Sequence, residues 1–360
     1  MLQKKSTRIL VTAILIFLLI YLISITNFIF APVAAYIAAI AVPIIGAGLI
    51  FYITNPIVNL LEKYKVPRIL GILIVFLLII GILFFGINFV APIVQQQFNK
   101  LVNSVPNMVR NAEELINLWQ NSQSYIPKQF EETIQNITNN LMTYAENITG
   151  ALVDTVAQIF GFVFSFFLIP FFLFFMLKDG DKFIPFITQF LSENKSNSLR
   201  KLASDINHTL ASFIQGQFIV SLCVGIMLYI GYLIIDLPYS LTLALFSIVM
   251  NLIPFVGPFL SAVPAVIVGF FQEPMLGVWA AVVMIIAQQI EGNFISPNVM
   301  GKVLKIHPLT VITLILAAGG IAGFLGLLFI IPAYAVIKTI ASHFYNEWKE
   351  RQPADEKDII

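Results

Sequence analysis

Asn251-Leu-Ile-Pro-Phe-Val-Gly-Pro258 interrupts an otherwise apolar run in the last third of the chain. A second polar stretch, Gln288-Gln-Ile-Glu-Gly-Asn293, ends the next apolar run. Amide and carboxylate side chains are costly at membrane depth, so there they persist mainly where they face protein or water. Prolines and glycines at that depth free backbone groups that lipid cannot satisfy, so such backbone is buried in protein or lines a cavity. If these runs lie in a membrane, the two stretches mark the centre of the molecule.

The composition is that of a membrane protein. Hydrophobic residues make up 59% of the sequence and charged residues 11%, whereas roughly a quarter of the residues in soluble domains are charged. Several charge-free runs exceed the ~18 residues that indicate a membrane helix. The sequence therefore predicts an all-α polytopic membrane protein with about six to eight membrane-embedded helical segments. Cys223 is the only cysteine, which excludes an intramolecular disulfide.

The N-terminal part, 1–94, predicts a bundle of three spans. Basic residues near the start precede a charge-free run that continues to Leu61. That run is about twice one bilayer crossing, so it predicts two helices with a turn near Thr26. A cleaved signal peptide is the less favoured alternative, because a second span follows with hardly any polar loop between.

Residues 95–153 predict an extracytoplasmic amphipathic helical arm. Charged residues return in this segment, and apolar residues recur at helical spacing on both sides of a turn at Ser122–Pro127. We interpret the segment as a solvated arm that packs on itself or on a neighbouring subunit.

Residues 154–341 predict the core, and 342–360 a cytoplasmic tail. The first span of the core ends at Lys178-Asp-Gly180, where the lysine suits the negative end of the helix dipole and Asp-Gly suits a C-terminal turn. We interpret this motif as a structural stop rather than a binding site. A cytoplasmic amphipathic segment, 182–208, follows, with apolar residues at helical spacing.

Basic residues set the expected orientation of the chain. Most lysines and arginines lie at the N-terminus, in the loop 62–68, in the segment 178–208 and towards the C-terminus. The arm carries only Lys100, Arg110 and Lys128. The sequence therefore predicts that both termini are cytoplasmic.

Two ways of threading the last third stay open. In one, 240–271, 274–290 and 308–340 are plain spans, which would place Lys302 and Lys305 outside, against the positive-inside rule. In the other, the first and last of these runs are re-entrant hairpins. Each such run of about 32 residues would be near 48 Å as one helix, against a hydrocarbon core of about 30 Å.

We favour the hairpins, with tilted long helices as the alternative. The expected breaks fall at 254–258 and 319–323, where prolines or glycines cluster. The residues expected to shape these breaks and the loop between the two hairpins are Pro254, Gly257, Pro258, Pro297, Gly301, Gly319, Gly320 and Gly323.

Four motifs occur in order along the chain: Phe171-Phe-Leu-Phe-Phe-Met-Leu-Lys-Asp-Gly180, Gly216-Gln217, Asn251-Leu-Ile-Pro-Phe-Val-Gly-Pro258, and Gln289-Ile-Glu-Gly-Asn-Phe-Ile-Ser-Pro297 with Gly301 and His307-Pro308. In order and spacing, over almost the whole chain, they resemble the autoinducer-2 exporter family of bacterial membrane proteins. The third motif commonly ends in Tyr-Val-Gly-Pro in that family, and here Phe255 stands in place of the tyrosine, which removes a hydroxyl.

The resemblance implies a transporter of the bacterial cytoplasmic membrane. The family's founding member is associated with export of autoinducer-2, a signal of quorum sensing, and other members with exchange of sodium or lithium for protons. The resemblance also implies a homo-oligomer, a pentamer in particular.

Glu291 is the residue expected to couple transport to a gradient. A carboxylate can take up a proton or pair with a cation, and an intramembrane charge is functional by default. The alternative is an interfacial carboxylate paired with Lys302 or Lys305.

The amide side chains around Glu291 are the expected solute ligands. They can donate and accept hydrogen bonds, which suits a polyhydroxylated solute. Polar contacts between helices are the alternative for each of them. The residues are Gln288, Gln289, Asn293, Asn251 and Gln217.

The sequence indicates neither an enzyme nor a cofactor, metal or nucleic-acid site. His208, His307 and His343 are dispersed, and no catalytic or nucleotide-binding motif occurs. Transport would therefore run on gradients. We expect a carrier that exports a small polar, autoinducer-2-like solute by alternating access, with a sodium or lithium/proton antiporter as the alternative. A passive channel is a third class, which a pH-independent flux would favour.

Overall fold

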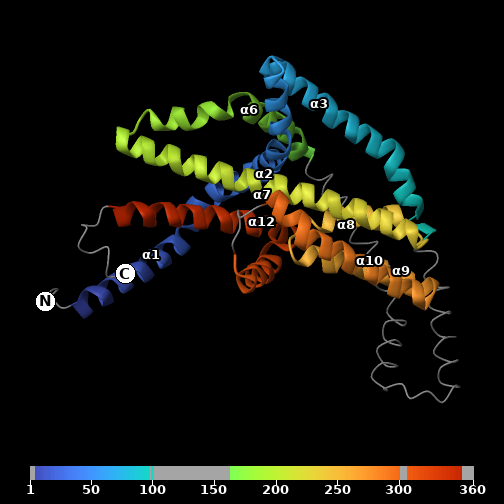
Figure 1. The fold of residues 1–360 in the computed structure, drawn as a ribbon. Coiled ribbons are helices and arrows are strands. Elements are labelled where there is room, and N and C mark those ends of the chain that lie inside the picture. The colour runs from blue at the N-terminus through green and yellow to red at the C-terminus, as the bar shows by residue number, and fades with distance from the viewer. Residues whose placement is uncertain (1–4, 98, 101–162, 301–305, 351–360) are drawn as a thin grey trace.

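The structure, a computed structural model, describes residues 5–97, 99–100, 163–300 and 306–350. In these ranges the chain is mainly helical, and none of their residues forms a strand. Figure 1 shows long helices packed along one another, with α7 running through most of the molecule. The predicted all-α fold is confirmed.

Five helical segments of the described chain are long and apolar enough to cross a membrane. They are Ala31–Lys63, Arg68–Gln97, Glu193–Ile234, Pro274–Met300 and Gly326–Lys349. Shorter apolar helices accompany them. Large apolar side chains cover the outside of these helices, as at Leu77, which is 69% exposed, and lipid is the solvent in which such a surface is stable. The protein is a multi-pass membrane protein.

The first three helices follow the predicted pattern. α1 (Lys5–Ile25) and α2 (Asn27–Lys63) are separated at Thr26, where the turn is predicted. α3 (Arg68–Phe85) continues through a π-helical turn, η1 (Gly86–Val90). The far end of this helix contacts the core, because the backbone N–H of Thr242 donates to Gln97 Oε1 at 3.3 Å. Most of the predicted arm lies outside the described residues, so its structure stays a prediction.

α6 (Val163–Thr188) packs on α2 and α3 around a small apolar core. Ala47, Val58 and Ile72 are fully buried on one side of this core, and Leu177 on the other. The predicted stop at Lys178-Asp-Gly180 is wrong, since α6 continues for two more turns and Gly180 lies inside it. On the exposed face of this part of α6, Lys182 Nζ donates to Asp179 Oδ1 at 2.7 Å, three residues apart.

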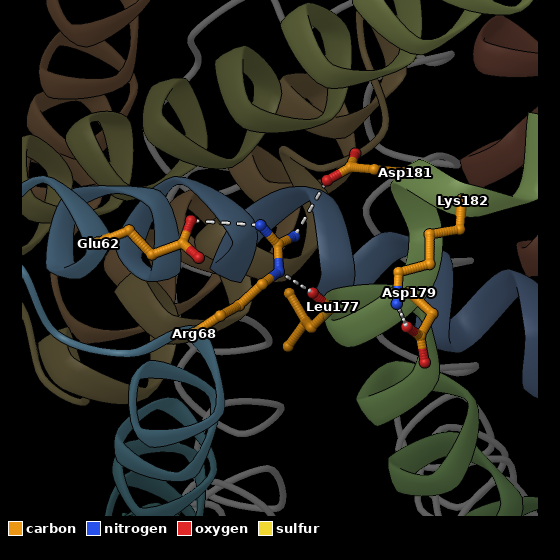
Figure 2. A network of polar contacts seen from close by, with 6 residues as sticks. All are labelled: Glu62, Arg68, Leu177, Asp179, Asp181 and Lys182. Atoms are coloured by element: carbon orange, nitrogen blue, oxygen red, sulfur yellow. Dashed lines mark hydrogen bonds and ion pairs between the residues drawn. The ribbon is translucent and has the colours of Figure 1, made fainter. Parts of the chain in front are cut away.

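Arg68 joins three helices at this end of α6 (Figure 2). Its Nε donates to the backbone carbonyl of Leu177 at 2.7 Å, and its Nη1 to Glu62 Oε2 at 3.2 Å. Its Nη2 lies 3.5 Å from Asp181 Oδ2. The Lys182 ammonium, which donates to Asp179, holds the pKa of that carboxyl below its usual value. The Lys-Asp-Gly motif thus serves as a charged anchor rather than as a helix stop.

α7 (Glu193–Ile234) is the longest helix of the core after α12. The predicted segment 182–208 is divided between the end of α6 and the start of α7. Its aromatic residues stay on the surface, since Phe183, Phe186 and Phe190 are 63%, 63% and 77% exposed. The second half of α7 packs against α8 (Ser240–Met250) and α10 (Pro274–Ile290).

The run over 240–271 folds back on itself, as the hairpin threading predicts. α8 ends at the Asn251–Phe255 turn, and α9 (Val256–Gln272) returns along both α8 and α10. The turn needs glycine at position 257, because a Cβ there would lie 2.0 Å from the Met250 carbonyl oxygen. Phe255 adopts a left-handed backbone with φ of 64° to complete the reversal.

The run over 308–340 also bends back. It lies within α12 (Pro308–Glu350), where Gly323 takes a left-handed φ of 55°. A Cβ on Gly319 would lie 3.0 Å from Leu327 Cδ2, although eight residues of straight helix would separate them by about 12 Å. Neither late run is therefore a straight span. That both hairpins begin and end on one face of the membrane stays a prediction.

Candidate functional site

The two stretches that interrupt the apolar runs meet at one cavity of about 860 Å³. α7, the α8–α9 turn, α10 and the start of α12 surround it, together with η2 (Glu291–Ile295) and α11 (Ser296–Met300). Of the residues predicted to bind solute or ions, the structure brings five to this cavity: Gln217, Asn251, Gln288, Gln289 and Glu291. The predicted Asn293 does not line it and is exposed.

The predicted break residues are divided between the cavity and its supports. Pro254, Pro258 and Pro297 line the cavity, whereas Gly257 packs in the turn behind it. Gly301 lies outside the described residues, and Gly319, Gly320 and Gly323 lie in the bend of α12. The breaks therefore shape one wall of the cavity rather than supplying polar side chains to it.

Gln217 and Asn251 hold the α8–α9 turn in place. Gln217 Nε2 donates to the backbone carbonyl of Asn251 at 2.6 Å, and Asn251 Nδ2 donates to the Ser247 carbonyl at 2.8 Å. Both residues are buried. A helix that ends inside a membrane protein leaves its last carbonyls without backbone donors, and Gln217 supplies a donor to the Asn251 carbonyl. The Ser247 carbonyl also accepts from the Asn251 backbone N–H at 2.8 Å, so the Asn251 side chain adds a second donor to it within the end of α8. Gln217 thus makes the interhelical contact that stands as the alternative to solute binding.

Gln215, which the sequence reasoning did not select, also donates to a free backbone carbonyl, on the other face of α7. Its Nε2 donates to the Tyr52 carbonyl at 2.9 Å. Pro56 follows Tyr52 by four residues and has no N–H, so it leaves that carbonyl free. Between the two glutamines, Gly216 allows α11 to approach, because a Cβ there would lie 2.9 Å from Met300 Cγ. The signal in the sequence for the Gln215 contact is a proline inside a predicted span, because the proline leaves a carbonyl free.

Gln288 lines the cavity and has an unsatisfied donor. Its Nε2 is buried and makes no hydrogen bond with the described residues. Gln289 is different, since its Oε1 accepts from Asn293 Nδ2 at 3.1 Å. An unsatisfied buried donor costs about 1–3 kcal/mol, so this amide favours an acceptor from a solute or a water molecule.

Glu291 is held by a π-helical turn. Its Oε1 accepts from Ser296 Oγ at 2.9 Å. Positions five apart lie on different faces of an α-helix of 3.6 residues per turn, but η2 has the i→i+5 register that brings them together. Ser296 is a second residue that the sequence reasoning missed, because a change of helical register has no signal in the hydrophobic pattern.

Among the described residues that line the cavity, Glu291 is also the only one with a charged side chain. No ion pair joins it to another residue within 5–97, 163–300 or 306–350. Lys302 and Lys305, its alternative partners, lie outside the described residues, so that pairing stays untested. The described part of the chain contains no group of three or more His, Cys, Asp or Glu side chains that could hold a metal ion.

Comparison with known proteins identifies the family of the chain. The model of the AI-2E family transporters matches residues 2–346. A Bacillus subtilis (strain 168) protein named "Putative transport protein YueF" is 38% identical over 343 residues, which cover 94% of this chain and 93% of the relative. A protein of Escherichia coli (strain K12) named "Putative permease PerM" is 24% identical over 347 residues, which cover 89% of this chain and 95% of the relative. This chain therefore belongs to the AI-2E family of membrane transporters.

Proposed function

We propose that the protein exports a small polyhydroxylated solute of the autoinducer-2 type through the 860 Å³ cavity. The single observation that supports this most is the convergence of two amides and one carboxylate on one apolar chamber. Gln288 supplies an unpaired donor, Gln289 an amide, and Glu291 a carboxylate. A solute with several hydroxyl groups can both donate to and accept from such a set.

Apolar side chains form the rest of the wall and give the cavity its shape. Phe213, Val220, Ala281 and Met284 are among them. Ligand sites commonly combine an apolar lining with a few polar groups that fix orientation. A chamber of this kind favours a small, compact solute with a localised polar face.

Glu291 is the proposed coupling group. When ionised it only accepts hydrogen bonds, as it does from Ser296, whereas the protonated acid can also donate one. Uptake of a proton at one membrane face and its loss at the other would change how the cavity holds solute. Alternating access driven by a proton gradient follows from that cycle.

The N- and C-termini are proposed to be cytoplasmic in the bacterial cell membrane, on the distribution of lysine and arginine. A homo-oligomer, pentameric in particular, is proposed on the family resemblance alone. Membrane lipid, the solute, and protons or sodium are the proposed partners.

The proposed function is tested by flux into and out of proteoliposomes under an imposed pH gradient. Autoinducer-2 and sodium are compared in the same preparation. Gradient-dependent movement of autoinducer-2 without sodium flux is the expected result. Sodium or lithium flux that needs the proton gradient, with no movement of autoinducer-2, would replace the proposal by the antiporter. Equal flux at every pH would instead indicate a passive channel.

A matched pair of variants ties the flux to the cavity. Gln288→Ala removes the unpaired donor, whereas Asn298→Ala removes an exposed amide that donates to the Phe294 carbonyl and does not line the cavity. Gln288→Ala should lose a hydrogen bond to the solute worth about 1 kcal/mol. The solute concentration that gives half-maximal flux should therefore rise by about fivefold. Asn298→Ala should match the parent protein.

A further inference from the structure

A second cavity, of about 620 Å³, lies between the first half of α7 and the last part of α12. The helix faces that enclose it are polar at almost every position, although two packed helices ordinarily meet through apolar side chains. The side chains include hydroxyls, amides and charges of both signs. They are Asn194, Asn197, Ser198, Lys201, Asp205, His208, Thr209, Lys338, Thr339, Ser342, His343, Asn346 and Glu347. We name this cavity the vestibule.

Polar contacts across the vestibule keep its two walls together. Ser198 Oγ lies 2.9 Å from His343 Nε2 and also donates to Glu347. His343 is 8% exposed, so this part of the seam is closed to solvent. Thr209 Oγ1 and Thr339 Oγ1 approach to 3.4 Å further along the same seam. The vestibule is therefore a pocket whose two walls are held together by polar contacts, rather than a gap at the ends of the helices.

The vestibule and the central cavity lie in line along the same two helices. Thr209 and Ala335 line the vestibule, and Phe213 and Ile331 line the central cavity. Each pair is four residues apart, so little more than one helical turn of about 5.4 Å separates the two spaces. The two helices are antiparallel here, since residue number rises along α7 and falls along α12 in the same direction.

An apolar layer occupies that single turn. Phe213 and Ile331 are 5% and 3% exposed, and they pack with Val311 and Ile315 in one buried cluster. Val311 comes from the first arm of the α12 bend and Ile331 from the second. An apolar constriction in a polar path excludes water and polar solutes by dewetting. The bend in α12 thus places both of its arms against the point where the two cavities would connect.

We propose that the vestibule is the inner mouth of the transport route and that the Phe213–Ile331 layer is its closed gate. This inference rests on the proposed function, because it assigns the vestibule to the same polyhydroxylated solute. Hydroxyl and amide groups line most of the vestibule and one part of the otherwise apolar central cavity, which suits one solute passing from the first to the second. Opening the gate requires only that the two sides of the layer separate by the width of the solute.

Cysteine accessibility tests the gate without any solute. In a Cys223→Ser background, Ala262→Cys places a thiol on the wall of the central cavity, and Ser342→Cys places one in the vestibule. A membrane-impermeant methanethiosulfonate reagent is added to inside-out and to right-side-out vesicles. Ser342→Cys should react quickly in inside-out vesicles only, and Ala262→Cys should react slowly there.

Phe213→Ala should speed the reaction of the cysteine at position 262 from the vestibule side by roughly tenfold. Phe172→Ala is the matched control, since Phe172 is a partly buried phenylalanine of the α2–α3–α6 core and lies in neither cavity. It should leave the rate unchanged. Phe213→Leu and Ile331→Ala remove fewer atoms and should give smaller accelerations if Phe213→Ala does not fold.

Unchanged rates in all three gate variants would overturn the proposal. Fast reaction of Ser342→Cys from the right-side-out vesicles alone would also overturn it, because the vestibule would then be an outer mouth. Absence of autoinducer-2 flux together with accelerated labelling would reject the solute and retain the gate. Normal flux with unchanged labelling would retain the solute and reject the gate.

Discussion

At the scale of single residues, the amides of this protein divide into two kinds. Gln215 and Gln217 use their donor groups on carbonyls that helix breaks leave free, and Asn251 adds a second donor to the Ser247 carbonyl. Gln288 lines the cavity, and its buried Nε2 has no such partner among the described residues. The sequence predicts that polar groups gather at 251–258 and 288–301, but it cannot divide them, because the division depends on which carbonyl lies opposite each amide.

Glu291→Gln tests the coupling role. The amide keeps the shape and hydrogen-bonding capacity of the acid while it fixes the charge at zero. The variant should fold and insert, and its solute flux should lose the dependence on pH that the parent protein shows. Flux measured in proteoliposomes over a range of pH gives the comparison.

Glu291→Asp is the control for this prediction, since it retains the carboxylate one methylene further back. It should keep the pH dependence at a lower rate. A wild-type rate and pH profile in Glu291→Gln would show that the carboxylate is interfacial and that another group couples transport.

At the scale of helices, the structure depends on breaks that the sequence marks with proline and glycine. Both late reversals, at 251–257 and at 319–323, fall where the sequence predicts them, because lipid-facing helices of that length do not fit a bilayer. The continuation of α6 past Gly180 was not predictable in the same way. A glycine costs a helix only about 1 kcal/mol relative to alanine, and the Arg68 and Lys182 contacts that hold this end come from tertiary packing and charge.

Gly257→Ala tests the first reversal. Its methyl group would meet the Met250 carbonyl at 2.0 Å, and a backbone atom cannot move aside as a side chain can. We expect a loss of about 3 kcal/mol or more of folding stability, or failure to fold. Gly320→Ala is the control, because a Cβ there has open space around it. Thermal unfolding of the detergent-solubilised variants distinguishes them, and equal stability would show that the turn can open.

Arg68→Ala tests the anchor between α2, α3 and α6. The guanidinium is partly buried, and its Nε donates to the backbone carbonyl of Leu177 in another helix. Its loss should cost about 1.5–3 kcal/mol, the range for hydrogen bonds to charged groups. Lys178→Ala removes an exposed charge 3.8 Å from Asp179 and should cost less than about 1 kcal/mol. The same unfolding measurement would contradict the anchor if both variants melted alike.

At the scale of the whole molecule, one long helix lines both cavities and the apolar layer between them. α7 lines the vestibule with its first half and the central cavity with its second. Hydrophobic runs in the sequence predict that such a helix exists. They cannot show that its first turns pair with the far end of α12, since the polar seam joins residues 145 and 149 positions apart and is formed only when α12 bends back.

The threading of the chain gives the last prediction. α9 and α10 form an antiparallel pair joined at Glu273, so this turn and α11, which ends at Met300, lie at opposite ends of α10. Hairpin threading predicts that Glu273 lies outside and that Lys302 and Lys305 lie inside. In a Cys223→Ser background, Glu273→Cys should therefore react with an impermeant thiol reagent added to intact cells. Leu304→Cys should be protected until the membrane is opened. Ready labelling of Leu304→Cys in intact cells would place this position outside and restore the eight plain spans. Labelling of Glu273→Cys alone would instead fix the orientation of both hairpins and leave the vestibule facing the cytoplasm.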